Sequence, residues 1–275
     1  MSAIKQKFNG KPLIEVPKEY LTIGFLEGDF GKEVLNEYKG RAKDYNKHLD
    51  ILSYKYNIVQ GSNPFAVVLM NKVLNEEGLK TASQSDLEKA IKLNALSLNG
   101  TYEDTALILR NENNPNSYLA KHLMKQVKER NKKAKTPIMI TLNQLELVND
   151  TASEYGLAFK LKEDAEIIYA PILNDEVGNF SSEDIDEKTG LPIKLGKGNR
   201  TLYTRDSGLS RLYLSRNLVL FARNDNLAYS YSIGRVVVVS GEATEKFSNE
   251  YKTAKKDYFF KLRKIKENID KELNE

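Results

Sequence analysis

Residues 211–240 read RLYLSRNLVLFARNDNLAYSYSIGRVVVVS, and this window is the most informative part of the chain. In its first half the even positions are apolar or small, with Arg216 as the exception; they are Leu212, Leu214, Leu218, Leu220 and Ala222. The odd positions between them share no common chemistry. Because alternate residues of a strand point to opposite faces of a sheet, the window predicts strands with one uniform core face and one chemically mixed face.

The same alternation resumes after the turn signal Asn224-Asp225-Asn226, and the β-branched run Val236–Val239 predicts a buried strand. The side chains expected on the mixed face are our candidate ligand-binding residues. They are Tyr213, Ser215, Asn217, Val219, Phe221, Arg223, Asn224, Asn226, Tyr229, Tyr231 and Ile233.

The composition of the window is also unusual. It contains four of the ten Arg residues of the chain and none of its 32 Lys, and it lacks Glu, Gln, Met and Pro. Tyr, Ser, Asn and Arg remain on the mixed face, as in an antibody paratope, where Tyr gives rigid contact area and Ser and Asn give adaptable hydrogen bonds. A solvated sheet face is the alternative, although such a face would use Lys and Glu as freely as the rest of this chain does.

Two flanking stretches, 207–214 (SGLSRLYL) and 234–240 (GRVVVVS), resemble the variable protein of an archaeal-type diversity-generating retroelement. Such systems copy a template with errors at adenines, so that Asn codons ending in a pyrimidine never become Lys, Glu, Gln, Met or Trp. The resemblance implies a C-type-lectin fold whose small sheet displays the variable side chains. It also implies a partner that is a protein or glycan on another cell or particle.

The rest of the chain predicts an α+β fold with a helical N-terminal half, a C-type-lectin-like antiparallel β region and a C-terminal helix. These parts correspond to residues 1–135, 136–241 and 242–275. Periodicity predicts helices over 32–56, 65–75, 84–94 and 116–132. Strands are predicted over 138–140, 145–148, 157–161, 165–169, 201–204 and 236–239, with 157–161 and 165–169 expected to pair as a hairpin.

Composition excludes several kinds of site. The 275 residues include no Cys and two His, which excludes disulfides, thiol nucleophiles and zinc sites built on Cys. The acidic loop 183–187 has the spacing of a calcium ligand set, and a solvated loop is its simpler explanation. Glu103 and Asp104 could form an acid/base pair, but a helix capping or surface role is the simpler expectation. We therefore expect no cofactor, no metal and no enzymatic activity.

Partners are constrained only in part. A net charge of +4 is too small to imply a nucleic-acid partner by itself, and the basic run 125–135 is explained more simply by its place at a helix C-terminus, so such a partner is not expected. No apolar run reaches the roughly 18 residues of a membrane span. We expect no signal peptide, and the sequence does not indicate a location. The leading hypothesis is a diversified ligand-binding protein. The alternative is a structural protein of a virus particle, joined into a homo-oligomer through the C-terminal helix 242–275.

Overall fold

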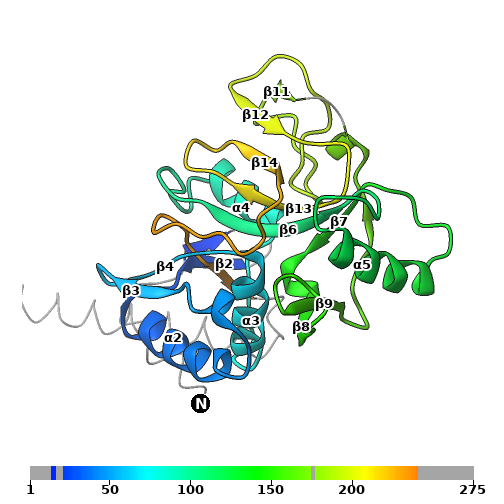
Figure 1. Ribbon diagram of the computed structural model, residues 1–275. Coiled ribbons are helices and arrows are strands. Elements are labelled where there is room, and N and C mark those ends of the chain that lie inside the picture. The colour runs from blue at the N-terminus through cyan, green and yellow to red at the C-terminus, as the bar shows by residue number, and fades with distance from the viewer. Residues whose placement is uncertain (1–13, 17–20, 175–176, 241–275) are drawn as a thin grey trace, which may run out of the picture.

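The computed structural model describes residues 14–16, 21–174 and 177–240 (Figure 1). Its main feature is a curled seven-stranded sheet, in which only β12 and β14 are parallel neighbours. The strand order is β10 (Ile168–Tyr169), β7 (Ile138–Thr141), β6 (Glu103–Leu109), β13 (Leu209–Leu214), β14 (Leu220–Asn224), β12 (Arg200–Tyr203) and β11 (Gly178–Phe180).

A second, four-stranded sheet joins both ends of the described chain. Its order is β1 (Ile14–Val16), β2 (Leu21–Phe25), β15 (Val237–Ser240) and β5 (Leu79–Thr81). Two further pairs are antiparallel ribbons: β3 (Ser53–Lys55) with β4 (Ile58–Gln60), and β8 (Leu145–Asn149) with β9 (Leu157–Leu161).

The described residues contain four α-helices: α2 (Gly28–Ala42), α3 (Pro64–Asn75), α4 (Gln84–Lys92) and α5 (Ser117–Arg130). Three short 3-10 helices are η1 (Lys47–Leu49), η2 (Leu142–Gln144) and η3 (Pro171–Asn174). Helix α3 begins where Asn63 accepts a hydrogen bond from the Ala66 N–H and Pro64 occupies the first turn. The helices predicted over 65–75, 84–94 and 116–132 are thus confirmed to within a few residues.

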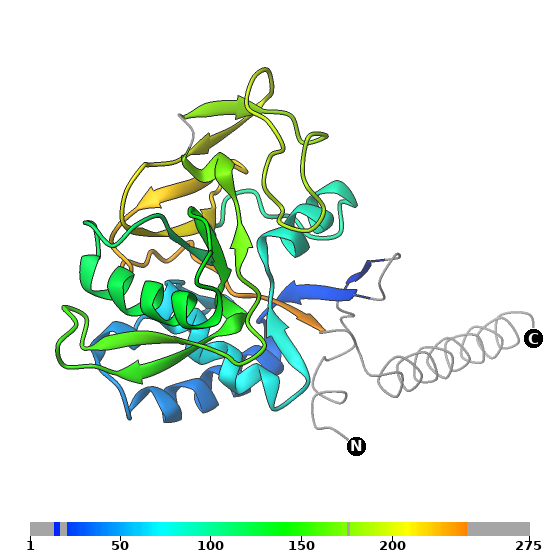
Figure 2. The same ribbon diagram turned by 90° about the vertical axis from the view of Figure 1, so that its right-hand side faces the viewer.

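Strand β6 lies between β7 and β13 in the large sheet and is buried along its whole length. Its Leu107 and Leu109 face a core that includes α3 and α5, whereas Ala106 and Ile108 face a second core that includes α4. Figures 1 and 2 show these helices on the two sides of the sheet. A strand covered on both sides has no polar face, so it loses the period-2 signal by which strands are recognised.

The expected fold class is wrong, because the described part of the protein is mostly β: the N-terminal half contains the four α-helices but also strands β1–β6, so it is not a helical region. The helix predicted over 32–56 ends at Ala42 and is followed by β3 and β4. The first half also supplies β6, which pairs with β7 and β13 and joins residues 1–135 to 136–241 in one mixed sheet. The expected C-terminal helix 242–275 lies outside the described residues.

The expected hairpin between 157–161 and 165–169 is also wrong. Strand β9 pairs with β8, and β10 pairs with β7 at the edge of the large sheet. Alternation fixes which face of a strand is buried, but it carries no information on which strand is the partner. The other predicted strands, including 201–204 and 236–239, lie where they were expected.

Candidate binding surface

The outer part of the large sheet, formed by β13, β14 and β12, has two unlike faces. One face is buried against α4 and the segment 170–191, through Leu202, Leu212, Leu214, Leu220 and Ala222. On the opposite face, Tyr203, Tyr213 and Phe221 are only half-buried. The even positions of the window therefore form the core face, except that Leu218, in the β13–β14 turn, is only partly buried.

None of the eleven candidate residues is buried. Six are exposed: Asn217, Arg223, Asn226, Tyr229, Tyr231 and Ile233. Five are half-buried: Tyr213, Ser215, Val219, Phe221 and Asn224. Ser215, Asn217 and Val219 lie at the β13–β14 turn, and the last three candidates lie in the segment that leads to β15. The candidates thus fall into three groups: the strand face, the turn and the 225–235 segment.

Aromatic rings connect the strand face to the 225–235 segment. We call the aromatic row the six residues Tyr203, Phe221, Tyr213, Tyr102, Tyr231 and Tyr229, in this spatial order. Phe221 stacks between Tyr203 and Tyr213, with ring centroids 4.8 and 5.1 Å apart and planes within 12°. The other contacts are edge to face: Tyr102 with Tyr213 at 5.7 Å, Tyr102 with Tyr231 at 6.4 Å, and Tyr229 with Tyr231 at 4.3 Å.

Strand pairing explains why the first three rings stack. Tyr203 is directly opposite Phe221 in the parallel pair, and Phe221 is opposite Tyr213 in the antiparallel pair. Rings at directly opposed positions point to the same face and lie within stacking distance. Register shifts beside Tyr213 add a bulge on each side of β13, which also brings Asp104 of β6 opposite Tyr213.

Two arginines flank the stacked rings. The Arg223 guanidinium lies 4.4 Å from the Tyr203 centroid, and the Arg211 guanidinium lies 4.7 Å from that of Tyr213. A guanidinium over a ring face is attracted by the ring quadrupole. Arg223 is exposed and Arg211 is buried, so only the first is available to a partner.

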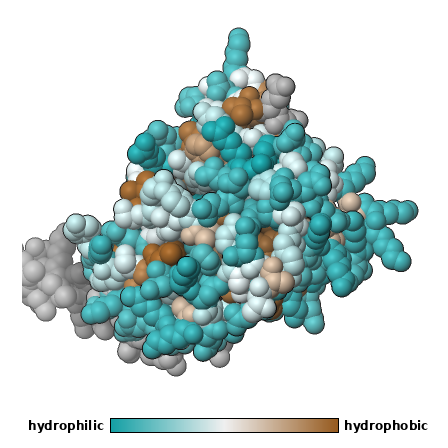
Figure 3. Space-filling model, in the orientation of Figure 1, coloured by the Kyte–Doolittle hydropathy of each residue, from teal (hydrophilic) through white to brown (hydrophobic). Residues whose placement is uncertain are grey.

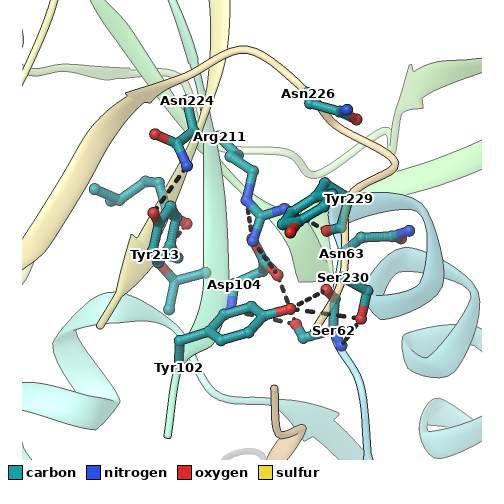
Figure 4. A network of polar contacts seen from close by, with 12 residues as sticks. Ser62, Asn63, Tyr102, Asp104, Arg211, Tyr213, Asn224, Asn226, Tyr229 and Ser230 are labelled. Carbon is teal, nitrogen blue, oxygen red and sulfur yellow. Dashed lines mark hydrogen bonds and ion pairs between the residues drawn. The ribbon is translucent and has the colours of Figure 1, made fainter. Parts of the chain in front are cut away.

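A buried polar network lies beneath the 229–231 part of the row (Figure 4). The guanidinium of Arg211 forms an ion pair with Asp104 at 2.8 Å and donates a hydrogen bond to the Tyr229 carbonyl at 2.6 Å. The Ser62 hydroxyl donates to the Asp104 carboxylate at 2.6 Å. The 229–231 backbone is therefore attached to the sheet through charges that are themselves paired.

Tyr102 attaches the same segment from the other side. Its hydroxyl donates to the Ser62 carbonyl at 2.9 Å and accepts from the Tyr231 N–H at 2.8 Å. Burial raises the pKa of Tyr102, and the nearby Asp104 carboxylate raises it further, so the phenol stays neutral and keeps its donor role. The backbone that carries the exposed rings of Tyr229 and Tyr231 is therefore held in place by hydrogen bonds from Arg211 and to Tyr102.

Sequence analysis did not identify four residues of this surface: Tyr102, Tyr203, Asp104 and Arg211. Tyr102, Asp104 and Tyr203 lie outside the window 211–240. Arg211 lies inside the window, beside a residue that was predicted to be in the core. The expectation that Glu103 and Asp104 lie on a helix surface is wrong, because both are buried in β6. Tyr203 lies in the predicted strand 201–204, and the presence of an aromatic residue in that strand is the signal by which it could have been found.

Glu103 is the most perturbed acid of the region. Burial raises its pKa to about 8, although Thr101 and the Arg235 guanidinium act in the opposite direction. A raised carboxyl pKa is common in active sites. The cavity beside Glu103, which Arg235 also lines, has a volume of about 10 Å³. That is room for about one water molecule and not for a substrate.

The acidic loop 183–187 does not assemble a ligand set. The Asp186 carboxylate accepts hydrogen bonds at 2.8 Å from both the N–H and the hydroxyl of Thr189, which lowers the pKa of Asp186. Among the described residues, no three His, Asp or Glu side chains are grouped as a metal ion would require. No helix in that same part of the chain has the length and apolar character needed to cross a membrane.

Comparison of the chain with protein-family models, with curated protein sequences and with solved structures gave no significant match.

Proposed function

We propose that the protein is a ligand-binding protein that contacts its partner through the aromatic row and the adjoining 225–235 segment, and that it is not an enzyme. One observation carries the proposal. Six aromatic rings from four separate parts of the chain form a continuous row, in which Tyr102 is buried and connects the half-buried stacked rings to the exposed Tyr229 and Tyr231 at the end. Tyr and Arg are the residues that dominate binding energy at protein interfaces.

The ring geometry favours a protein surface as the partner. Tyr203, Phe221 and Tyr213 use their faces to stack on one another, so a sugar or base finds no free face between them. Their edges and the Tyr203 hydroxyl remain for contact, together with the exposed guanidinium of Arg223, whereas the Tyr213 hydroxyl accepts a hydrogen bond from the Asn224 side chain at 2.8 Å. Such groups suit the carbonyl and carboxylate acceptors of a folded protein. The surface is also mixed in character: the side seen in Figure 3 is mostly hydrophilic with small, separate apolar patches.

We also propose that this surface is diversified, as the resemblance to retroelement variable proteins implies. The supporting observation is that the eleven candidates all have some exposure, whereas Leu212, Leu214, Leu220 and Ala222 on the other face are buried. Side chains on the accessible face can therefore change without opening the core. The test is a search of the surrounding DNA for a near-copy of the codons for 207–240 that differs at adenines and lies beside a reverse transcriptase. Its absence from a complete locus would refute diversification but not binding.

Binding itself is tested with two defined probes, a displayed library of random 12-residue peptides and a glycan array. The test variant is Tyr229→Ala/Tyr231→Ala, and the control is Tyr118→Ala on α5, because Tyr118 and Tyr229 are both 41% exposed. We expect selected peptides to bind the wild type and the control, and to bind the double variant at least about tenfold more weakly. Equal binding by all three proteins would refute the proposed surface, and binding only to glycans would refute the protein partner.

A further inference from the structure

A second accessible site lies at the β10 edge of the large sheet. An open cavity of about 470 Å³ separates β10 from the turn 186–193. Tyr169 on one wall and Ile193 on the other are 50% and 68% exposed. These two side chains leave apolar surface on both walls of the cavity that an apolar side chain of a partner could cover.

The backbone of β10 offers hydrogen bonds toward this cavity. Tyr169 is paired with Ile138 of β7, and the Ala170 N–H donates to the Pro137 carbonyl at 2.9 Å. In an antiparallel ladder this bond identifies Tyr169 and Ile138 as a non-hydrogen-bonded pair. The N–H and C=O of Tyr169 therefore point away from β7, toward the side on which another strand would be added.

The net charge of the residues around the cavity indicates which charge a bound segment would carry. The described residues 162–174 and 177–194 contain seven acidic and three basic side chains, a net charge of −4 in a chain whose total is +4. Glu166 and Asp186 line the cavity, and Lys188 on its rim is already in an ion pair with Glu166. An acidic rim around an apolar cavity attracts a segment that carries both basic and apolar residues.

We propose that the β10 edge and its cavity bind an extended, basic segment of a partner protein by strand addition. The backbone of that segment would pair with the N–H and C=O of Tyr169. An apolar side chain would enter the cavity between Tyr169 and Ile193, and the alternate Lys or Arg side chains would reach the acidic rim. A symmetric pairing of two copies through this edge is disfavoured, because it would place two regions of charge −4 together. This proposal is independent of the aromatic row.

The test uses three seven-residue peptides with blocked ends. The first alternates Lys and Val, the second is the same peptide N-methylated at its central residues, and the third alternates Glu and Val. We expect the first to bind and to slow hydrogen exchange at the Tyr169 amide. N-methylation removes backbone donors while it keeps charge and apolar side chains, so the second should bind at least about tenfold more weakly. Binding of the Lys peptide without protection of Tyr169, or equal binding of all three, would overturn the proposal.

Two variants of the protein separate backbone pairing from side-chain contact. Tyr169→Pro removes the outward N–H, and an edge strand tolerates Pro where the lost donor did not serve the ladder. Tyr169→Ala is its control, because it loses the same ring and keeps the N–H. We expect the Pro variant to bind the Lys peptide about threefold to tenfold more weakly than the Ala variant, with Tyr229→Ala/Tyr231→Ala binding as the wild type does. Indistinguishable Pro and Ala variants, both folded by circular dichroism, would refute strand addition.

Discussion

The inner and outer parts of the seven-stranded sheet are stabilised in different ways. Strand β6 is covered by apolar cores on both faces, whereas β14, β12 and the Tyr213 end of β13 are covered on one face only. The accessible face of the outer part is held by stacked rings and by a buried ion pair. The outer face is therefore ordered by specific contacts that leave its exposed side chains free, as a binding surface requires.

A second buried ion pair lies on the covered side of the sheet. Arg200 of β12 donates two hydrogen bonds to the Glu88 carboxylate of α4, at 2.5 and 2.7 Å, and both side chains are buried. Arg211 and Asp104 lie on the accessible side of the sheet. Each pair attaches the outer strands to another element, α4 in one case and the 229–231 segment in the other. Each fixes a position in the fold rather than adding net stability.

The largest effect is expected for Arg211→Leu. The substitution leaves the Asp104 carboxylate buried without its ion pair and removes the hydrogen bond to the Tyr229 carbonyl. We expect the free energy of unfolding to fall by about 3–5 kcal/mol in urea denaturation. Arg211→Leu/Asp104→Asn should recover part of the loss, because the second change removes the buried charge. A loss below about 1 kcal/mol would show that the outer face does not depend on this pair.

The next effect is a dependence on pH that arises from Glu103. Its folded pKa of about 8 lies above the ordinary value of 4.5, so the folded state prefers the protonated acid. The stability from this group is complete below about pH 4.5 and is lost as the pH rises to about 8, by about 1.4 kcal/mol per pH unit. Neighbouring Asp104 also has a raised pKa, from burial against the opposing effect of Arg211, and it adds to the same trend.

Glu103→Gln isolates the contribution of Glu103, because Gln is a neutral mimic of the protonated acid. We expect the variant to match the wild type near pH 4.5 and to be more stable by about 3 kcal/mol at pH 7. Urea denaturation between pH 4.5 and 8.5 measures the difference. Parallel stability curves for the two proteins would show that Glu103 is charged in the folded state.

The sequence predicted the outer face of the sheet better than its centre. Leu212 and Leu220 alternate with mixed residues because one side of their strands is accessible, and that alternation is visible in the letters. Strand β6 starts with Glu103 and Asp104 and is buried on both sides. Its acidic residues suggested a surface, since the ion pair of Asp104 with Arg211 joins residues more than 100 positions apart and local sequence does not show it.

The candidate site was predicted in part for a similar reason. The face on which each candidate lies follows from its odd or even position in the window, and this information is present in the local sequence. The rings that complete the row, Tyr102 and Tyr203, join through cross-strand register and bulges, which depend on the tertiary structure. The predicted pairing of 157–161 with 165–169 was wrong for the same reason, because strand pairing is a property of the whole sheet.

A smaller effect is expected for Phe221→Ala. Phe221 is half-buried and stacks on both Tyr203 and Tyr213, and each such contact contributes about 0.5–1.5 kcal/mol beyond area burial. We expect a loss of about 1–3 kcal/mol in urea denaturation. Phe221→Tyr, which retains the ring, is the matched control and should lose little. Equal losses for the two variants would show that stacking does not order the outer face.

The smallest effect on stability is expected for Tyr229→Ala, because its ring is exposed while its carbonyl, which the substitution keeps, accepts the hydrogen bond from Arg211. We expect a change within about 0.5 kcal/mol. Leu220→Ala is the comparison on the covered face, where truncation should cost about 2–5 kcal/mol. Thermal denaturation of both variants decides whether the two faces differ as proposed. If Tyr229→Ala lowered the melting temperature as far as Leu220→Ala does, the Tyr229 ring would be a structural element of the fold, and the aromatic row would lose its exposed end as a contact for a partner.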